Sequence, residues 1–153
     1  MTRDAIVHEV IYPHPVWKVW RALTDSTALA EWLMPNDFQP RLGHRFTFRR
    51  DQGNDWKGIV DCEVVEIIEP RRLAYTWQGR GLEFPATLVT FVLEPVENGT
   101  RLRLEHTGFR AGGPKFLAIR DILDSGWGSN VLRRRLPELL DRWGELSEGK
   151  ANS

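Results

Sequence analysis

The chain has 153 residues, of which 41 % are apolar and 27 % charged, a composition typical of a globular domain rather than a disordered segment. Basic and acidic residues both number 21, so the formal charge is zero, and nucleic-acid binding, which usually requires a basic excess, is not expected. Cys62 is the single cysteine, which excludes a disulfide framework and a cysteine-based zinc site.

The first part of the chain predicts one strand followed by two short helices. Residues 5–12 are rich in β-branched side chains, as is typical of a strand. Stretch 14–25 then carries apolar residues at helical spacing. A second helical stretch follows, with Asp25 or Ser26 as its N-terminal cap, and ends before Pro35.

The middle of the chain predicts strands only. Polar and apolar residues alternate, or β-branched residues dominate, in five stretches: 44–50, 56–68, 72–77, 87–95 and 100–106. Residues 51–55 read as a turn, and Gly58 is a candidate bulge position. Asn98-Gly99 reads as the tight turn of a hairpin.

The last part predicts a loop over 107–114 and one long helix over 115–146. Four apolar side chains repeat along one face of this helix: Phe116, Ile119, Leu123 and Trp127. Pro137 lies inside the pattern and is expected to kink the helix or to begin a new segment. Strands followed by a helix indicate an α+β fold, in which a curved antiparallel sheet grips the long C-terminal helix and two short helices edge a cavity between them.

Five motifs occur in this order along the chain: VWRALTD (19–25), LGHRFTF (42–48), GIVDCEVVEIIEPRRLAYTW (58–77), VTFVLEPVENGTRLRLEHTGF (89–109) and GW (126–127). Together they resemble the START-like (SRPBCC) helix-grip superfamily, and within it the homologues of the C-terminal domain of the heat-shock-protein-90 ATPase activator. The resemblance covers residues 5–143 and implies a single domain over 1–153.

The resemblance implies an elongated internal cavity and a ligand that is a lipid, a polyketide, a flavonoid-like aromatic or another apolar molecule. Some relatives are cyclases or aromatase-like enzymes. The eukaryotic activator stimulates its chaperone with the help of an additional N-terminal domain, so chaperone stimulation is not the first expectation here. Trp32-Leu33-Met34 stands where the family often has paired tryptophans, and Gly43-His44 where it often has two glycines, so the cavity mouth is expected to differ in shape.

Twelve side chains are expected to line the cavity: Trp32, Phe46, Phe48, Tyr75, Trp77, Phe91, Leu104, His106, Phe116, Ile119, Leu123 and Trp127. Periodicity does not distinguish a hollow cavity from a filled core, so both remain open. His106 shares a strand face with the leucines at 102 and 104, and it reads as a core histidine bonded to protein, a ligand contact or a general base. Glu105 points to the other face and cannot orient it.

The sequence gives little support for a metal site or for a nucleophilic catalytic residue. The four histidines lie on separate predicted elements, without carboxylates or cysteines at ligand spacing, so neither a metal nor a cofactor is expected. No serine stands in a G-x-S-x-G elbow, and Cys62 is expected to be an inert buried thiol. No catalytic residue is assigned.

The main expectation is therefore non-catalytic binding of a small apolar or aromatic molecule. A cofactor-independent cyclase, dehydratase or hydrolase, with His106 and Tyr75 as acid–base candidates, is one alternative. A chaperone-related protein-interaction module is the other. The charged opening stretch is unlike a secretory signal and no stretch is long enough to span a bilayer, so we expect a cytoplasmic monomer or homodimer.

Overall fold

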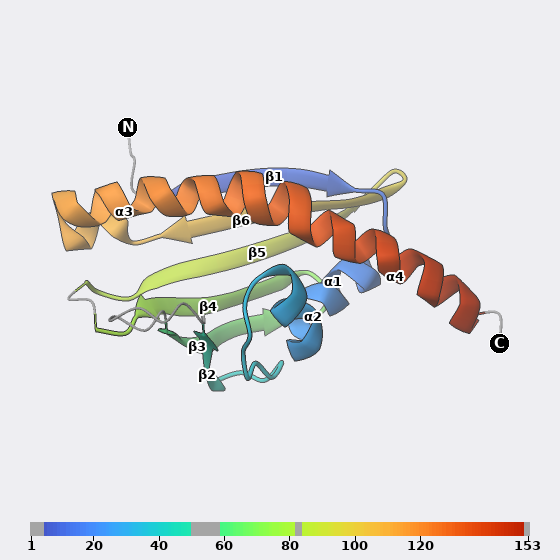
Figure 1. Cartoon of the computed structure of the whole chain (residues 1–153), viewed down its shortest axis with the longest axis horizontal. Helices are drawn as coiled ribbons and strands as arrows, with labels where there is room; N and C mark the ends of the chain where they lie inside the picture. Colours follow the sequence, from blue (N-terminus) through green and yellow to red (C-terminus); the bar gives the residue numbers. More distant parts are fainter. Residues whose placement is uncertain (1–4, 50–58, 82–83, 152–153) are drawn as a thin grey trace.

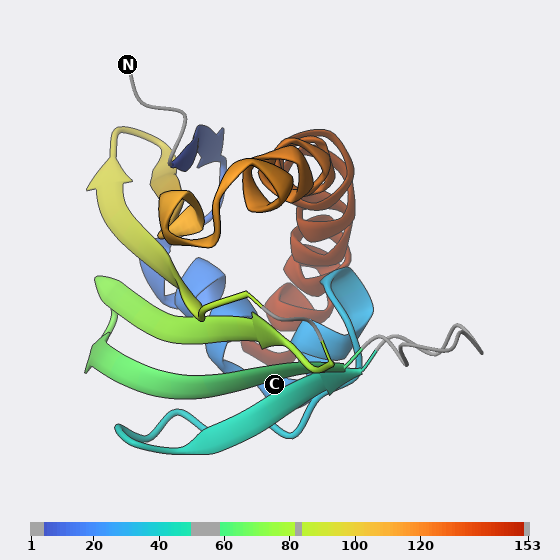
Figure 2. The same cartoon turned by 90° about the vertical axis from the view of Figure 1, so that its left-hand side faces the viewer.

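The computed structural model describes residues 5–49, 59–81 and 84–151, and within them a curved antiparallel sheet faces a long helical layer (Figure 1). The strands are β1 (Ile6–Tyr12), β2 (Arg45–Arg49), β3 (Ile59–Ile68), β4 (Arg72–Gly79), β5 (Thr87–Val96) and β6 (Gly99–Thr107). The sheet order is β1-β6-β5-β4-β3-β2, so β2 to β6 form a meander and β1 pairs beside the last strand. Figure 2 shows the sheet curving around the helical layer.

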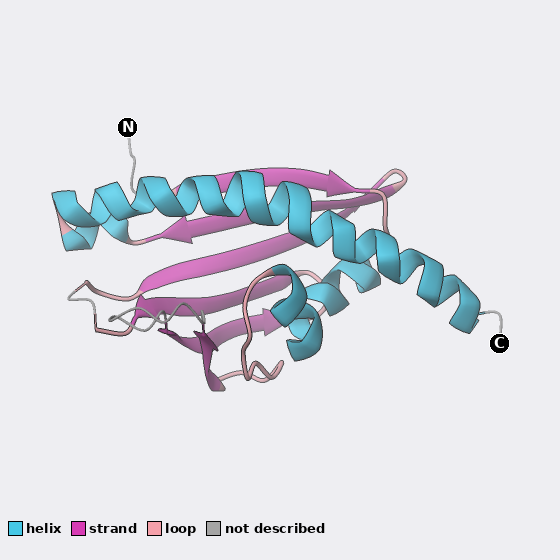
Figure 3. Ribbon diagram, viewed as in Figure 1, coloured by secondary structure: helices cyan, strands magenta, loops and turns pink. Residues whose placement is uncertain are grey.

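Two short helices cross from β1 to the opposite edge of the sheet, and a long helical segment ends the chain (Figure 3). They are α1 (Val16–Thr24) and α2 (Ser26–Trp32), followed at the C-terminal end by η1 (Phe109–Gly112), α3 (Pro114–Ser125), η2 (Gly126–Arg135) and α4 (Leu136–Ala151). The Asp25 carboxylate accepts a hydrogen bond from the Ala28 N–H at 3.1 Å, which confirms Asp25 as the cap of α2. The predicted α+β helix-grip fold is confirmed.

The concave face of the sheet carries the core, and β6 shows how its sequence produces this. Thr100, Leu102, Leu104 and His106 alternate with polar residues and are completely buried. Side chains along a strand alternate between the two faces, so all four point the same way. The alternation predicted over 101–106 is therefore confirmed, with His106 inside the protein.

The long helical segment changes its winding in the middle. Residues 126–135 form a π-helix, in which the Leu136 N–H donates to the Val131 carbonyl five residues back. The next residue, Pro137, has no N–H and cannot donate to the Leu132 carbonyl. The Tyr12 hydroxyl donates to that carbonyl instead, at 2.6 Å. Pro137 thus lies in the first turn of a new segment, α4. Of the two expectations for this proline, a kink or the start of a new segment, the second is confirmed.

The β5–β6 hairpin is confirmed, but its turn lies one residue earlier than predicted. Val96 pairs with Gly99, and the turn residues are Glu97 and Asn98, of which Asn98 has a φ of 69°. Gly99 is needed for a different reason. A Cβ at this position would lie 2.2 Å from the Tyr12 carbonyl oxygen, so only glycine allows the two strands to meet here.

Two further details differ from the sequence predictions. The loop predicted after β6 contains the short 3₁₀ turn η1. A register shift interrupts the β3–β4 pairing between Val64 and Glu66. The bulge predicted at Gly58 and the turn predicted at 51–55 lie outside the described residues.

Candidate functional site

Aromatic rings from five separate elements meet on the concave face of the sheet. We call the following seven residues the aromatic wall: Phe38, Phe46, Phe48, Tyr75, Trp77, Phe91 and Trp127. Their ring centroids are 5.0 Å apart for Phe38–Phe46 and 5.5 Å apart for Trp77–Trp127. The planes meet edge-on or at a tilt, which is the arrangement that ring quadrupoles favour. The wall is therefore one continuous aromatic surface.

The structure brings the twelve candidate residues together at this surface or next to it. Ten of them are at most 9 % exposed: Trp32, Phe46, Phe48, Tyr75, Trp77, Phe91, Leu104, His106, Phe116 and Trp127. Ile119 and Leu123 on α3 are half-buried and pack against the same core. Whether these side chains contact a ligand stays a prediction.

Phe38 is the wall residue that the sequence did not indicate. It lies in the connection between α2 and β2, where no periodic pattern marks an inward-facing side chain. The Asn36 carboxamide holds this connection in place, since its oxygen accepts from the Phe38 N–H at 3.0 Å and its nitrogen donates to the Ser26 carbonyl at 3.1 Å. These bonds orient the chain so that the Phe38 ring reaches Phe46.

His106 lies in a buried hydrogen-bonded chain that joins the helical segment to the sheet. The Trp127 indole N–H donates to His106 Nδ1 at 3.1 Å. Nδ1 must therefore be unprotonated, so Nε2 carries the hydrogen and donates it to Thr87 Oγ1 at 2.7 Å. The Thr87 hydroxyl in turn donates to the Trp77 carbonyl at 3.0 Å. Every donor in this network has an acceptor.

This network favours one of the three interpretations of His106, that of a core histidine bonded to protein. Both ring nitrogens are engaged with protein groups, and the side chain is 0 % exposed. Burial lowers the pKa of His106 to about 3, so the imidazole is neutral near pH 7. The residue is a core histidine bonded to protein, and its Nδ1 lone pair is occupied rather than available to a substrate proton.

Tyr75 differs from the other buried polar groups of the wall. Its hydroxyl finds no hydrogen-bond partner among residues 5–49, 59–81 and 84–151, although the residue is 0 % exposed. Burial, and to a smaller extent the neighbouring Cys62 thiol, raises the pKa of Tyr75 well above its usual value. The hydroxyl is therefore neutral. Burial likewise raises the pKa of Cys62, consistent with the inert thiol that was predicted.

The α3 helix is packed less tightly than the rest of the helical layer. Phe116 is its one buried side chain among those described, and its ring stacks on that of Phe84 with the ring centroids 4.4 Å apart. Ile119 and Leu123 remain half-buried, and Ile122 is 72 % exposed. In contrast, η2 and α4 bury six apolar side chains: Trp127, Val131, Leu132, Leu136, Leu139 and Leu140. Apolar side chains of α3 itself therefore remain partly exposed.

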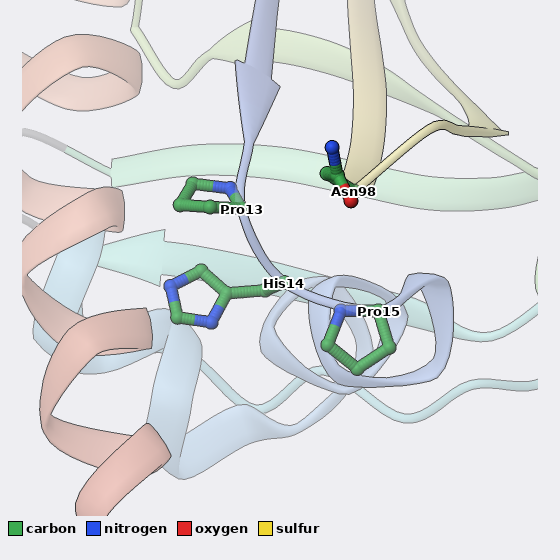
Figure 4. A pocket seen from close by; sticks show the side chains of 5 residues that line it. Pro13, His14, Pro15 and Asn98 are labelled. Carbon is green, nitrogen blue, oxygen red and sulfur yellow. The ribbon is translucent and has the colours of Figure 1, made fainter.

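A shallow surface hollow of about 250 Å³ lies at the corner between β1 and α1 (Figure 4). It is lined by Pro13, His14, Pro15, Asn98 and Gly99, none of which is a candidate residue. The hollow is thus separate from the aromatic wall.

Two histidines have carboxylate partners that the sequence did not indicate. Lys18 donates to His14 Nδ1 at 2.9 Å, and His14 Nε2 donates to Asp141 at 3.0 Å. His8 Nε2 donates to Asp124 at 2.7 Å. These partners are more than 100 residues apart in the chain, so no spacing rule could find them.

Neither a metal cluster nor a membrane-spanning helix is found in the described part of the chain. The histidine, cysteine, aspartate and glutamate side chains there nowhere form a group of three or more able to hold a metal ion. The helices there are also too short or too polar to cross a membrane.

The comparisons with known proteins agree with this architecture. A family model described as "Activator of Hsp90 ATPase homolog 1-like protein" matches residues 13–141. The solved structure of MLL2253 from Mesorhizobium loti is 39 % identical over 90 % of this chain and 97 % of that one, with a TM-score of 0.78. The Bacillus halodurans protein BH1534 is 30 % identical over 89 % and 96 %, with a TM-score of 0.71.

A third solved structure, DynU16, described as a protein in the dynemicin biosynthetic locus, is 25 % identical with a TM-score of 0.76. The match covers 90 % of this chain and 47 % of DynU16. A comparison with curated proteins gave no match. Since the family model spans most of the sequence and the fold agrees, the chain belongs to the family of Activator of Hsp90 ATPase homolog 1-like proteins, within the START-like superfamily.

Proposed function

We propose that this protein binds a small apolar or aromatic molecule against the aromatic wall and does not transform it. The observation that carries the proposal is the continuous aromatic surface on the concave face, beside a helix that leaves its own apolar side chains half-exposed. Ligand pockets are mostly apolar and aromatic with a few placed polar groups, and this surface has that composition.

A ligand gains the most binding free energy at the α3 end of the sheet. Ile119 and Leu123 already expose part of their apolar surface, so covering them with a ligand removes that surface from water. Separating α3 from the sheet exposes fewer fully buried side chains than separating η2 or α4. A ligand therefore enters at α3 and spreads along the wall toward Trp77.

The geometry of His106 supports binding over catalysis. The enzyme alternative needs a base, but Trp127 occupies the free lone pair of His106 and Thr87 accepts its one hydrogen. The hydroxyl of Tyr75 stays neutral because burial raises its pKa. The similarity to DynU16, which belongs to a biosynthetic locus, supports a small molecule as the ligand.

The test uses two substitutions on α3. Ile119→Trp adds a large ring at a half-buried position that packs against the core, whereas Ile122→Trp adds the same ring at a position that is 72 % exposed. Naphthalene, fluorene and 9-fluorenone are titrated into the ¹⁵N-labelled protein, and amide shifts are followed by NMR. Thermal unfolding of both variants checks that each is folded.

We expect saturable amide shifts with at least one probe, centred on β4, β5 and α3. Ile119→Trp should weaken binding at least fivefold, and Ile122→Trp should leave it within twofold of the wild type. Equal affinity of the two variants, or no saturable shift with any of the three probes, would overturn the proposal.

A further inference from the structure

We propose that the ligand is an uncharged molecule with a carbonyl oxygen, which accepts a hydrogen bond from the Tyr75 hydroxyl. This inference rests on the proposed function, since it names the chemistry that the aromatic wall recognises. Its starting point is that this hydroxyl, fully buried on β4, has no hydrogen-bond partner within the described residues.

The two tyrosines of the chain form a natural comparison. Both are at most 2 % exposed, but the Tyr12 hydroxyl donates to the Leu132 carbonyl at 2.6 Å. Tyr12 therefore shows the ordinary condition of a buried hydroxyl, which is to be hydrogen-bonded. An unpaired buried hydroxyl is unfavourable, and no role in packing requires it, because phenylalanine has the same ring. A hydrogen bond to a ligand accounts for its presence.

The surroundings of Tyr75 determine what charge the ligand carries. Four phenylalanine rings lie within 6.3 Å of the Tyr75 ring, centroid to centroid: Phe38, Phe46, Phe48 and Phe91. Among the described residues, the side chain that contributes to the raised pKa of Tyr75 is that of Cys62, a thiol that burial keeps neutral. A charged ligand would lose its hydration here without gaining an ionic partner from these neighbours.

The chemistry of the hydroxyl determines the polarity of the hydrogen bond. A phenol is a better donor than acceptor, because its oxygen lone pairs are delocalised into the ring. Burial also raises the pKa of Tyr75, so the proton remains on the oxygen and can be donated. A ketone or similar carbonyl on an otherwise apolar ring system supplies the matching acceptor.

The test compares fluorene with 9-fluorenone, which differ by one carbonyl, in titrations followed by ¹⁵N NMR. The wild type should bind 9-fluorenone about five- to tenfold more tightly than fluorene, as a single net hydrogen bond provides. Tyr75→Phe should remove this preference, so that 9-fluorenone and fluorene bind the variant with equal affinity. Tyr12→Phe, the matched control, should keep the preference because its hydroxyl is already paired.

The outcomes separate this inference from the proposed function. If fluorene binds but the ketone has no advantage, or the advantage survives in Tyr75→Phe, the role of Tyr75 is wrong while the binding function stands. If naphthalene binds the wild type but 9-fluorenone does not, the inference of a carbonyl ligand is wrong, and if none of the three probes binds, the binding function itself fails. Fluorene-9-carboxylate tests the charge. It should bind at least tenfold more weakly than 9-fluorenone, and equal or tighter binding would overturn the inference of an uncharged ligand.

Discussion

The buried imidazole of His106 predicts a specific loss of stability in acid. Its pKa falls from an unperturbed 6.5 to about 3 in the folded protein because burial disfavours the charged form. Since the folded pKa is the lower one, the unfolded chain binds the extra proton, and acid favours unfolding. The stability is complete above about pH 6.5 and is lost progressively as the pH falls toward about 3.

The size of the effect follows from the difference between the two pKa values. Each pH unit well inside this window removes about 1.4 kcal/mol from the free energy of unfolding. Over the whole window from pH 6.5 to about 3 the loss is of the order of 5 kcal/mol. That is a large part of the 5–15 kcal/mol typical of a folded domain.

The assay is urea unfolding at a series of pH values between 7.5 and 4, for the wild type and for His106→Gln. The variant is less stable throughout, since it loses the bonds to Trp127 and Thr87, but it has no imidazole to titrate. The difference between the two stabilities should therefore shrink by about 1.4 kcal/mol per pH unit between pH 5.5 and 4. His44→Gln, which removes a half-buried histidine outside this network, controls for the loss of an imidazole.

Parallel pH profiles for the wild type and His106→Gln would refute the reasoning. They would mean that His106 accepts a proton in the folded state as readily as in the unfolded chain. The same conclusion would follow if His44→Gln changed the profile as much as His106→Gln does.

Urea unfolding at pH 7.5 tests three further predictions. Tyr12→Phe should cost about 1–3 kcal/mol, because it leaves the Leu132 carbonyl without the hydroxyl that pairs it. Tyr75→Phe should instead leave the ligand-free protein at least as stable as the wild type, because it removes a buried hydroxyl that has no partner among the described residues. Equal losses of stability in the two variants would contradict the different pairing of the two hydroxyls. Gly99→Ala should lower the free energy of unfolding by at least about 2 kcal/mol, since its Cβ would lie 2.2 Å from a carbonyl oxygen of β1. A urea midpoint equal to that of the wild type would show that the two strands can move apart without cost. Gly128→Ala should lower the free energy of unfolding by about 1–3 kcal/mol, because its Cβ would lie 2.5 Å from the His8 ring. The contact would be contradicted if the NMR signal of His8 were the same in this variant as in the wild type.

Local patterns in the sequence were enough to predict the fold. The alternation around Leu102 and Leu104 places His106 on the inner face, and the structure confirms this. The cap at Asp25 and the new helical segment at Pro137 were also predictable, because both depend on a few consecutive residues. Even so, periodicity gave no sign of Phe38, which reaches the wall from an irregular connection.

By itself, the sequence determined which face of each strand and helix is apolar, because side-chain direction depends on local backbone geometry alone. Only the tertiary structure decided which polar groups meet. Trp127 and His106 are 21 residues apart, and Tyr12 and Leu132 are 120 apart, so their pairing depends on how the helical layer lies across the sheet. The same packing pairs the hydroxyl of Tyr12 and leaves that of Tyr75 unpaired within the described residues. The sequence shows only that each tyrosine lies on a strand, so it does not predict this difference.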